Sequence, residues 1–179
     1  MKSGILHALE KSLDRIYNNY PVENEIDFQS VLFGELYKQF PDAIIRFEHR
    51  LKSDYQSYAR RGSITKNRKS RVDLHLSYAS QTIVIELKYF KGSSLEERTD
   101  MLADIAKVER IVEAKEANEG FCIHLIKEGI ISRLPSEIET KKYEMKVGRW
   151  DYNFEIKGIY EVNSTKALCG RSFIVHHIK

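Results

Sequence analysis

Apolar residues recur along this chain with two different periods, and the period predicts which segments are helices and which are strands. Helical spacing predicts helices over residues 3–18, 25–40 and 93–117, of which the first two end at Pro21 and Pro41. Shorter apolar runs predict strands over residues 43–51, 71–78, 82–90, 120–127, 150–162 and 172–179. A hairpin followed by a helix and a further strand predicts an α/β fold with a mixed central sheet flanked by helices.

The predicted hairpin RVDLHLSYASQTIVIELKYF (71–90) carries charged residues in strands that are otherwise apolar. Because side chains alternate between the two faces of a strand, Glu86 and Lys88 share one face of the second strand. A two-residue turn at Ala79-Ser80 would place Asp73 of the first strand directly opposite Glu86. Directly paired residues have Cβ atoms about 5 Å apart.

The length of this turn decides what the hairpin can do. A three-residue loop would pair Asp73 with Leu87, and a four-residue loop would pair Asp73 with Lys88 as an ordinary ion pair in a structural sheet. With the two-residue turn, two carboxylates face each other and repel unless a positive charge lies between them. Mg²⁺ suits that place, because it takes oxygen ligands from one or two carboxylates together with waters and phosphate oxygens.

The two stretches RVDLHLSY and TIVIELKYF, with a helix before them and TDMLADIAKVERI after them, resemble the PD-(D/E)XK nuclease superfamily. The signature Asp, Glu and Lys of that family match Asp73, Glu86 and Lys88, whereas Val72 replaces its usual proline. The resemblance covers about residues 23–127 and implies a restriction-endonuclease-like core. Residues 1–179 are then expected to form a single nuclease-like domain, in which 128–179 add strands for specificity or dimerisation.

The resemblance implies a Mg²⁺-dependent endonuclease that hydrolyses phosphodiester bonds of nucleic acid, with DNA as the expected partner and Mn²⁺ as a substitute metal. Asp73, Glu86 and the main-chain carbonyl of Leu87 would bind the metal, and Lys88 would position the attacking water. Members of the family often add a glutamate from the first core helix. Three residues are candidates for that role, with the helix-start residue favoured: Glu25, Glu35 and Glu48. Each also fits a surface charge or, at a helix start, an acid favoured by the helix dipole.

A run of basic residues without any acid leads into the first hairpin strand. Such a run is usually a solvated loop, but beside a phosphate-cleaving site it would neutralise phosphates without reading sequence. The run therefore predicts a nucleic-acid contact through Arg60, Arg61, Lys66, Arg68, Lys69 and Arg71. It lies in residues 52–71, which have no apolar period and are expected to form a long loop or an irregular strand end.

Three other polar residues near the hairpin have ordinary interpretations. His75 shares the face of Asp73, where a structural hydrogen bond is the simplest role. Asp104 and Lys107 lie on the third predicted helix, and they fit either a polar pair near the site or an exposed i, i+3 pair.

Composition leaves these expectations in place. The 29 basic and 26 acidic residues nearly cancel to a net charge of +3, so no polyanion partner follows from charge alone. The two cysteines are far apart, and there is no signal-peptide pattern or apolar run of roughly 18 residues, so a cytoplasmic protein without a membrane partner is expected. Cutting both DNA strands would need two sites and therefore suggests a homodimer. The alternative is a catalytically silent nucleic-acid- or protein-binding module on the same fold.

Overall fold

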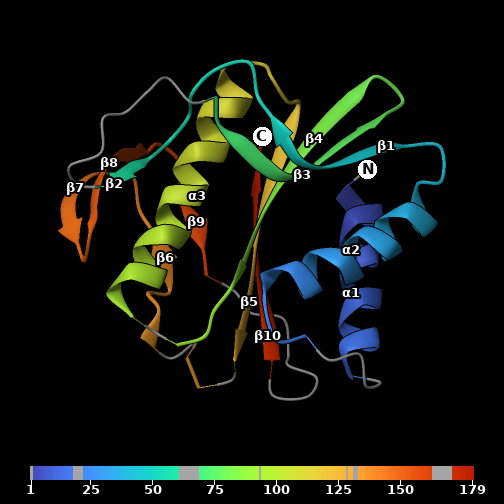
Figure 1. Cartoon of the computed structure of the whole chain (residues 1–179), viewed down its shortest axis with the longest axis horizontal. Helices are drawn as coiled ribbons and strands as arrows, with labels where there is room; N and C mark the ends of the chain where they lie inside the picture. The colour runs from blue at the N-terminus through green and yellow to red at the C-terminus, as the bar shows by residue number, and fades with distance from the viewer. Residues whose placement is uncertain are drawn as a thin grey trace.

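The computed structural model describes residues 2–17, 22–60, 69–92, 94–127, 129–130, 133–162 and 171–179. Within these residues the chain is a mixed α/β structure whose helices are α1 (Lys2–Tyr17), α2 (Glu25–Gln39) and α3 (Leu95–Glu113) (Figure 1). No helix in this part of the chain is both long and apolar enough to cross a membrane. The strands are β1 (Ile44–Arg50), β2 (Tyr58–Arg60), β3 (Arg71–Tyr78), β4 (Gln81–Tyr89), β5 (Glu119–Lys127), β6 (Glu137–Ile138), β7 (Lys141–Val147), β8 (Trp150–Ile156), β9 (Tyr160–Glu161) and β10 (Arg171–Ile178).

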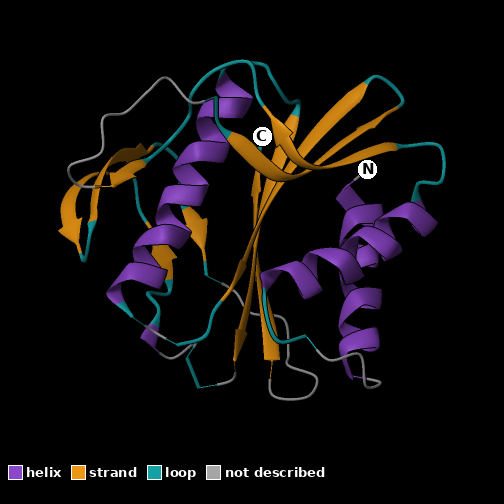
Figure 2. Cartoon of the chain, in the orientation of Figure 1, coloured by secondary structure: helices purple, strands orange, loops and turns teal. Residues whose placement is uncertain are grey.

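The central sheet has five strands in the order β1-β3-β4-β5-β10. β4 and β5 are parallel and are joined through α3, whereas the other neighbouring strands are antiparallel, so the sheet is mixed as predicted. Figure 2 shows α1 and α2 on one side of the sheet and α3 on the other. Two apolar clusters fill the spaces between these layers, and each includes fully buried residues of the central strands.

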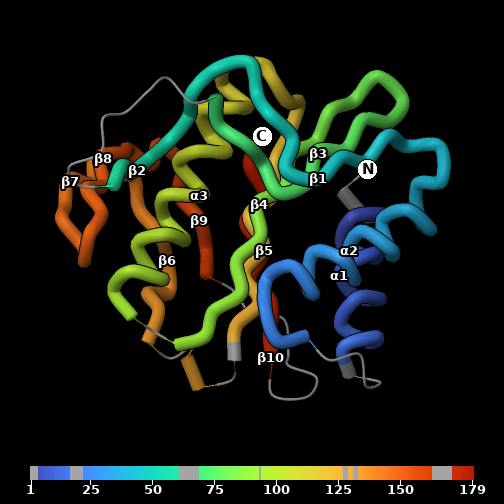
Figure 3. The backbone as a smooth tube through the Cα atoms, viewed as in Figure 1, coloured from blue at the N-terminus to red at the C-terminus, as the bar shows by residue number. Residues whose placement is uncertain are grey.

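A second sheet lies beyond α3 and has the strand order β2-β8-β7. Figure 3 shows how the chain leaves β1, reaches β2 in the second sheet, and then returns to the central sheet at β3. Hydrogen bonds hold this excursion to α3, because Arg110 donates to the Tyr55 carbonyl and Ser57 Oγ donates to the Ala103 carbonyl. The second sheet therefore covers the outer side of α3.

The sequence pattern predicts most of these elements but not the second sheet. The short strand β2 lies inside the predicted loop 52–71, and β6 and β7 are not predicted at all. The run 150–162, which is predicted as one strand, is divided into β8 and β9 by a break around Gly158. β2, β6 and β9 have only two or three residues and pair with distant segments, so the local apolar pattern is a weak signal for them. β7 is different, because Tyr143, Met145 and Val147 alternate with charged residues and provided a usable signal.

The turn between β3 and β4 has two residues, as the facing-carboxylate arrangement requires. Tyr78 pairs with Gln81, and both central residues, Ala79 and Ser80, have positive φ, 47° and 64°. Positive φ at both positions is the mark of a type I′ turn, whose twist matches that of the flanking strands. The two-residue turn is confirmed, and the three- and four-residue alternatives are wrong.

Local contacts fix where α2 and α3 begin and how closely α3 approaches the sheet. Asn24 caps α2 through the Asp27 N–H, and Ser94 and Glu97 form a capping box at the start of α3. Gly120 on β5 lets α3 come close, because a Cβ atom there would lie only 2.2 Å from Val108 Cγ1. The caps thus define the first residues of α2 and α3, and Gly120 lets α3 pack closely on β5.

Candidate functional site

The strands separate at Asp73. The β3–β4 pairing runs from the turn to Leu74 and Ile85 and stops one step before Asp73 and Glu86. On the other side, the β1–β3 pairing is interrupted between Phe47–Leu74 and His49–Val72, where Glu48 has a φ of 47°. If the β3–β4 register is continued by one step, Asp73 lies opposite Glu86. At this point β3 is paired with neither β1 nor β4.

Side chains take the place of the missing ladder bonds. Asp73 Oδ2 accepts a hydrogen bond from the Leu87 N–H at 2.6 Å, and Glu25 Oε2 accepts one from the Tyr89 N–H at 3.3 Å. The Asp73 carbonyl in turn accepts a hydrogen bond from Gln29 Nε2 of α2 at 2.8 Å. Each buried main-chain group thus keeps a partner, and two carboxylates are fixed beside the end of β4.

Glu86 points toward α3 and meets Lys107. The Lys107 Nζ lies 2.7 Å from Glu86 Oε1, and the two side chains are only 15% and 6% exposed. Oε1 is buried and has no hydrogen bond of good geometry among the described residues, so the contact with Lys107 is an ion pair only. Of the two interpretations that the sequence left for Asp104 and Lys107, the exposed pair is therefore wrong for Lys107, which lies beside Glu86.

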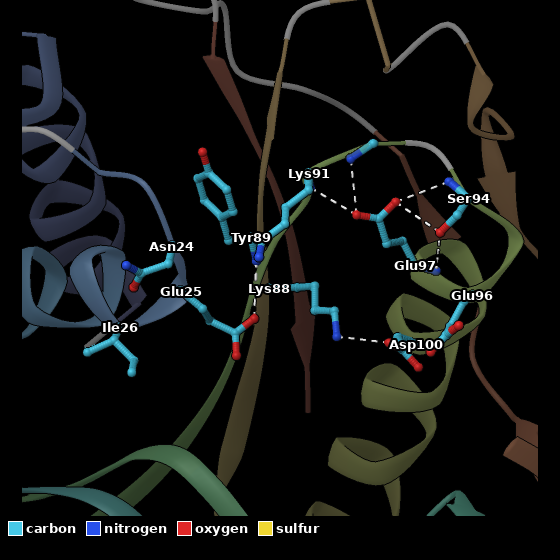
Figure 4. A pocket seen from close by; sticks show the side chains of 11 residues that line it. Asn24, Glu25, Ile26, Lys88, Tyr89, Lys91, Ser94, Glu96, Glu97 and Asp100 are labelled. Atoms are coloured by element: carbon cyan, nitrogen blue, oxygen red, sulfur yellow. Dashed lines mark hydrogen bonds and ion pairs between the residues drawn. The ribbon is translucent and has the colours of Figure 1, made fainter. Parts of the chain in front are cut away.

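Lys88 is held by a chain of two further residues. Its Nζ lies 2.9 Å from Asp100 Oδ2 of α3, and the Tyr152 hydroxyl of β8 donates to Asp100 Oδ1 at 2.6 Å. Figure 4 shows Lys88 reaching from β4 toward Asp100, while Glu25 approaches the same strand from α2. The hairpin, the third helix and the second sheet thus meet at Lys88.

A pocket of about 780 Å³ opens beside this group. Its lining comes from the first residues of α2, the end of β4 and the first turns of α3 (Figure 4). Glu25, Lys88 and Asp100 line it, whereas Asp73 and Glu86 do not. Any ligand in the pocket would therefore contact Lys88 and Glu25 before it reached the two strand carboxylates.

The group contains more acids than bases. Five carboxyl groups, Asp73, Glu86, Asp104, Glu25 and Asp100, interact electrostatically with two ammonium groups, Lys88 and Lys107. If all seven groups were ionised, the net charge would be 2 − 5 = −3. A cluster with this excess attracts cations and holds its protons more tightly than isolated acids do.

The pKa values reflect this imbalance. Burial and the Glu86 charge raise the pKa of Asp73 well above its usual range, although the hydrogen bond from Leu87 opposes the rise. Burial raises the pKa of Glu86 to about 7 against the attraction of Lys107, and burial likewise raises the pKa of Asp104 to about 7. For Lys88 and Lys107 burial lowers the pKa, but the surrounding carboxylates outweigh it and the net shift is upward.

The donor set suits a hard divalent cation. Among the described residues no three His, Cys, Asp or Glu side chains are gathered at metal-ligand spacing. Two carboxylates with a carbonyl are nevertheless an ordinary partial ligand set for Mg²⁺, which keeps several waters. Glu86 Oε1 is a buried acceptor without a good hydrogen bond, and the Leu87 carbonyl faces the same gap as its N–H, because both groups of a strand residue point to one side.

The three candidate upstream glutamates lie in different places. Glu25 is beside the end of β4 and acts on the charges of Asp73, Glu86 and Lys88. Glu35 is buried against α1, with ion pairs to Arg15 and Lys38. Glu48 is exposed on β1 and lies 3.9 Å from Arg71. Of the three, Glu25 is the residue that the fold brings to the group.

The basic run is described only in part. Arg60 is exposed at the end of β2, and Lys69 and Arg71 are exposed just before and at the start of β3. Arg61, Lys66 and Arg68 lie outside the described residues. Lys69 and Arg71 thus lie at the start of the strand that carries Asp73, whereas Arg60 lies on the second sheet, where it pairs with Trp150.

Histidine contributes little to this group. His75 packs its ring against His49 at 4.1 Å, and its Nδ1 has no hydrogen bond among the described residues. Burial, with the neighbouring His49 and Arg46, lowers the pKa of His75 to about 4, which keeps the ring neutral near pH 7.

Sequence reasoning missed Asp100 and Tyr152 altogether. Asp100, Asp104 and Lys107 recur at i, i+4 and i+7 on α3, and this polar stripe beside the apolar face was an available signal. Tyr152 had no such signal, because its role depends on how β8 packs against α3.

Comparison with known proteins gives no family assignment. No protein-family model matches the chain, and no curated protein matches it. Among solved structures, a crystal structure of SSO0001 shows similarity over 69% of this chain and 74% of its own, with 15% identity and a TM-score of 0.25. That TM-score is too low to establish a common fold, so the similarity carries no conclusion about function.

Proposed function

We propose that this protein is a Mg²⁺-dependent endonuclease with a restriction-endonuclease-like core, and that it hydrolyses phosphodiester bonds of DNA. The observation that carries the proposal is the buried excess of carboxylates around Asp73 and Glu86, with Lys88 at the next position on the strand. A purely structural sheet gains nothing from burying such an excess, because uncompensated buried charge is costly. A bound divalent cation would compensate it.

The proposed roles follow the positions of the side chains. Asp73, Glu86 and the Leu87 carbonyl hold the metal, which supplies Lewis-acid polarisation of a phosphate oxygen and acidification of a bound water. Lys88 lies beside the pocket, where its ammonium orients the attacking water or neutralises charge that develops on the phosphate. Asp100 and Tyr152 fix the direction of Lys88, and Glu25 adds negative charge at the pocket side.

The pocket also favours a metal-dependent reaction. Its acidic side chains, Glu25, Glu96, Glu97 and Asp100, outnumber Lys88 and Lys91. A phosphate diester is negatively charged and would be repelled from such a lining in the absence of a cation. The exposed residues Arg60, Lys69 and Arg71 are the proposed contacts for phosphates farther along the strand, together with Arg61, Lys66 and Arg68.

A cleavage assay tests the proposal. The purified protein is incubated with single-stranded, double-stranded and branched DNA, and with RNA, in Mg²⁺, Mn²⁺ or EDTA. We expect cleavage of DNA that requires the metal and falls by at least about 10²-fold in Asp73→Asn, Glu86→Gln and Lys88→Met. Asparagine at position 73 keeps an oxygen acceptor for the Leu87 N–H, so this variant removes charge while it preserves the hydrogen bond.

Glu48→Gln is the matched control, because Glu48 is an exposed acid close to Asp73 in the fold and outside the buried group. Its cleavage rate should equal that of the wild type. Cleavage that survives in Glu86→Gln, or that proceeds in EDTA, would show that the assigned residues do not carry the reaction.

The second candidate is a catalytically silent binding module, and one observation favours it. Both lysines of the group are already paired with protein carboxylates, Lys88 with Asp100 and Lys107 with Glu86. Such a network holds together without a metal. Calorimetric titration with Mg²⁺ distinguishes the two functions, because a silent module has no need to bind metal in a manner that depends on Asp73 and Glu86.

A further inference from the structure

Lys107 has no role in the proposed reaction, yet it occupies the centre of the acidic group. Its ammonium contacts Glu86 Oε1 at 2.7 Å, and the side chain is only 15% exposed. The carboxylates of Glu86, Asp104 and Asp73 all favour the charged form of Lys107. Lys107 is thus the cation that the protein itself supplies to the acids proposed to bind Mg²⁺.

Lys107 and a metal on Glu86 exclude each other. The ammonium is at contact distance from Oε1, so a divalent cation bound to the same carboxylate would lie against a like charge at low dielectric. A lysine has a flexible four-carbon stem and can move its charge by several ångströms without any backbone change. Binding of the metal therefore requires another position for the ammonium.

Asp104 provides that position. It lies one helical turn before Lys107 on α3, and residues three apart on a helix are neighbours. Its carboxylate forms no hydrogen bond or ion pair with the described residues, although both Lys88 and Lys107 act on its charge. A partly buried acid without a partner, within reach of a paired lysine, is an available second partner for that lysine.

We infer that Lys107 is an internal counterion that competes with the divalent cation for Glu86, and that metal binding transfers its ammonium to Asp104. This inference rests on the proposed function, because it assumes the metal position on Asp73 and Glu86. In the metal-free protein Lys107 compensates the buried acids and supports folding. In the metal-bound protein the same charge remains inside the group, one helical turn away.

Metal affinity in the absence of nucleic acid tests the competition. Mn²⁺ is titrated calorimetrically into the full chain at fixed pH and ionic strength, for the wild type, Lys107→Met and Lys107→Gln. We expect both variants to bind Mn²⁺ more tightly, with Kd lowered about tenfold, because the metal no longer displaces a charge. Lys107→Gln keeps a hydrogen-bond donor for Glu86 Oε1, so it tests the same point if Lys107→Met does not fold.

Lys142→Met is the control for the loss of one positive charge, because Lys142 is exposed on β7. Its Kd for Mn²⁺ should stay within about twofold of the wild type, since exposed charges are screened by salt. Asp104→Asn removes the carboxylate to which the Lys107 ammonium is proposed to move. As a single substitution it should weaken Mn²⁺ binding, whereas in combination with Lys107→Gln it should not. This double-mutant cycle separates an effect through Lys107 from a general effect of charge.

The outcomes are distinct. Tighter binding by the Lys107 variants supports the competition, and so does binding by these variants alone. Equal or weaker binding by them, with measurable binding by the wild type, overturns the competition and leaves the proposed nuclease site in place. Absence of Mn²⁺ binding in every protein overturns the metal site and the competition together.

Discussion

Glu86 is an acidic side chain buried in an apolar part of β4. It is 5% exposed and lies on a strand whose preceding residues, Ile83, Val84 and Ile85, are completely buried. One lysine contacts it, while Asp104 and Glu25 repel its charge. The residue is therefore stable as a protonated acid or beside an additional cation, and its ionisation should be visible in the stability of the protein.

We predict that the metal-free protein loses stability as Glu86 ionises. Its folded pKa of about 7 lies above the ordinary value of 4.5, so the folded state binds more protons between these values. The stabilisation that protonated Glu86 gives the folded state is therefore complete below about pH 4.5 and is lost as the pH rises through about 7. In EDTA, the unfolding free energy of the wild type should fall between pH 5 and pH 8. The fall should be smaller in Glu86→Gln, by roughly 1–3 kcal/mol, because this variant has no carboxyl to ionise.

Urea unfolding at a series of pH values measures this difference. Glu48→Gln should follow the wild-type curve, because its side chain is exposed. Parallel curves for Glu86→Gln and the wild type would contradict the raised pKa.

At the scale of elements, the whole acidic group depends on the register of the β3–β4 hairpin. Since the side-chain period of a strand is two, a slip by one residue would turn Asp73 to the opposite face. The turn residues Ala79 and Ser80 are unusual for positive φ, which Gly, Asn and Asp adopt more readily. The register is thus held mainly by the buried strand residues rather than by the turn sequence.

We predict that the double substitution Ala79→Asn/Ser80→Gly stabilises the protein. Asn-Gly is the preferred pair for a two-residue turn with positive φ at both positions, so the change should raise the unfolding free energy by about 1 kcal/mol. Chemical denaturation measures the gain. Ser53→Gly, at an exposed position without positive φ, should give no gain, and a loss of stability in the Asn-Gly variant would exclude this turn type.

At the scale of the whole molecule, the second sheet contributes directly to the candidate site. Tyr152 of β8 bonds Asp100 of α3, and Asp100 bonds Lys88 of the central sheet. Three layers that are separate in sequence therefore control the direction of one ammonium group. This connection gives residues 128–179 a part in the site beyond the strands expected from the sequence.

We predict that Tyr152→Phe reduces DNA cleavage more than it reduces stability. Loss of the hydroxyl frees Asp100 Oδ1 and lets Lys88 turn away, so the rate should fall about three- to tenfold, equivalent to about 1 kcal/mol for one hydrogen bond. Tyr143→Phe is the control, because Tyr143 on β7 stacks on Phe154 and has no described hydroxyl bond to the site. An equal loss in both variants would indicate a general effect of the second sheet.

The sequence predicted those parts of the molecule in which the local pattern and the tertiary contacts agree. Apolar periodicity located all three described helices and the central strands. Register counting correctly gave the two-residue turn and the pairing as far as Leu74 and Ile85, one step before Asp73 and Glu86. The second sheet was missed in part because β2 has only three residues and pairs with the distant strand β8. For β7 a signal was available, because Tyr143, Met145 and Val147 alternate with charged residues just before β8.

The candidate site was predicted less completely, for a physical reason. Asp73, Glu86 and Lys88 lie on one hairpin, so their relation follows from strand geometry alone. The partners of these residues, Lys107 and Asp100, depend on how α3 packs on the sheet. That packing is set in part by Gly120, whose missing side chain admits Val108. A glycine inside a strand can indicate a close approach, but the sequence does not tell which segment approaches.

The separation of β3 from β4 also provides a spectroscopic probe. The amides of Leu87 and Tyr89 donate to side-chain carboxylates, Asp73 and Glu25, in place of strand carbonyls. The chemical shift of an amide proton responds strongly to the charge and distance of its acceptor. In a nitrogen-15-labelled protein these two resonances would report any ion or proton that reaches the carboxylates, independently of substrate or turnover.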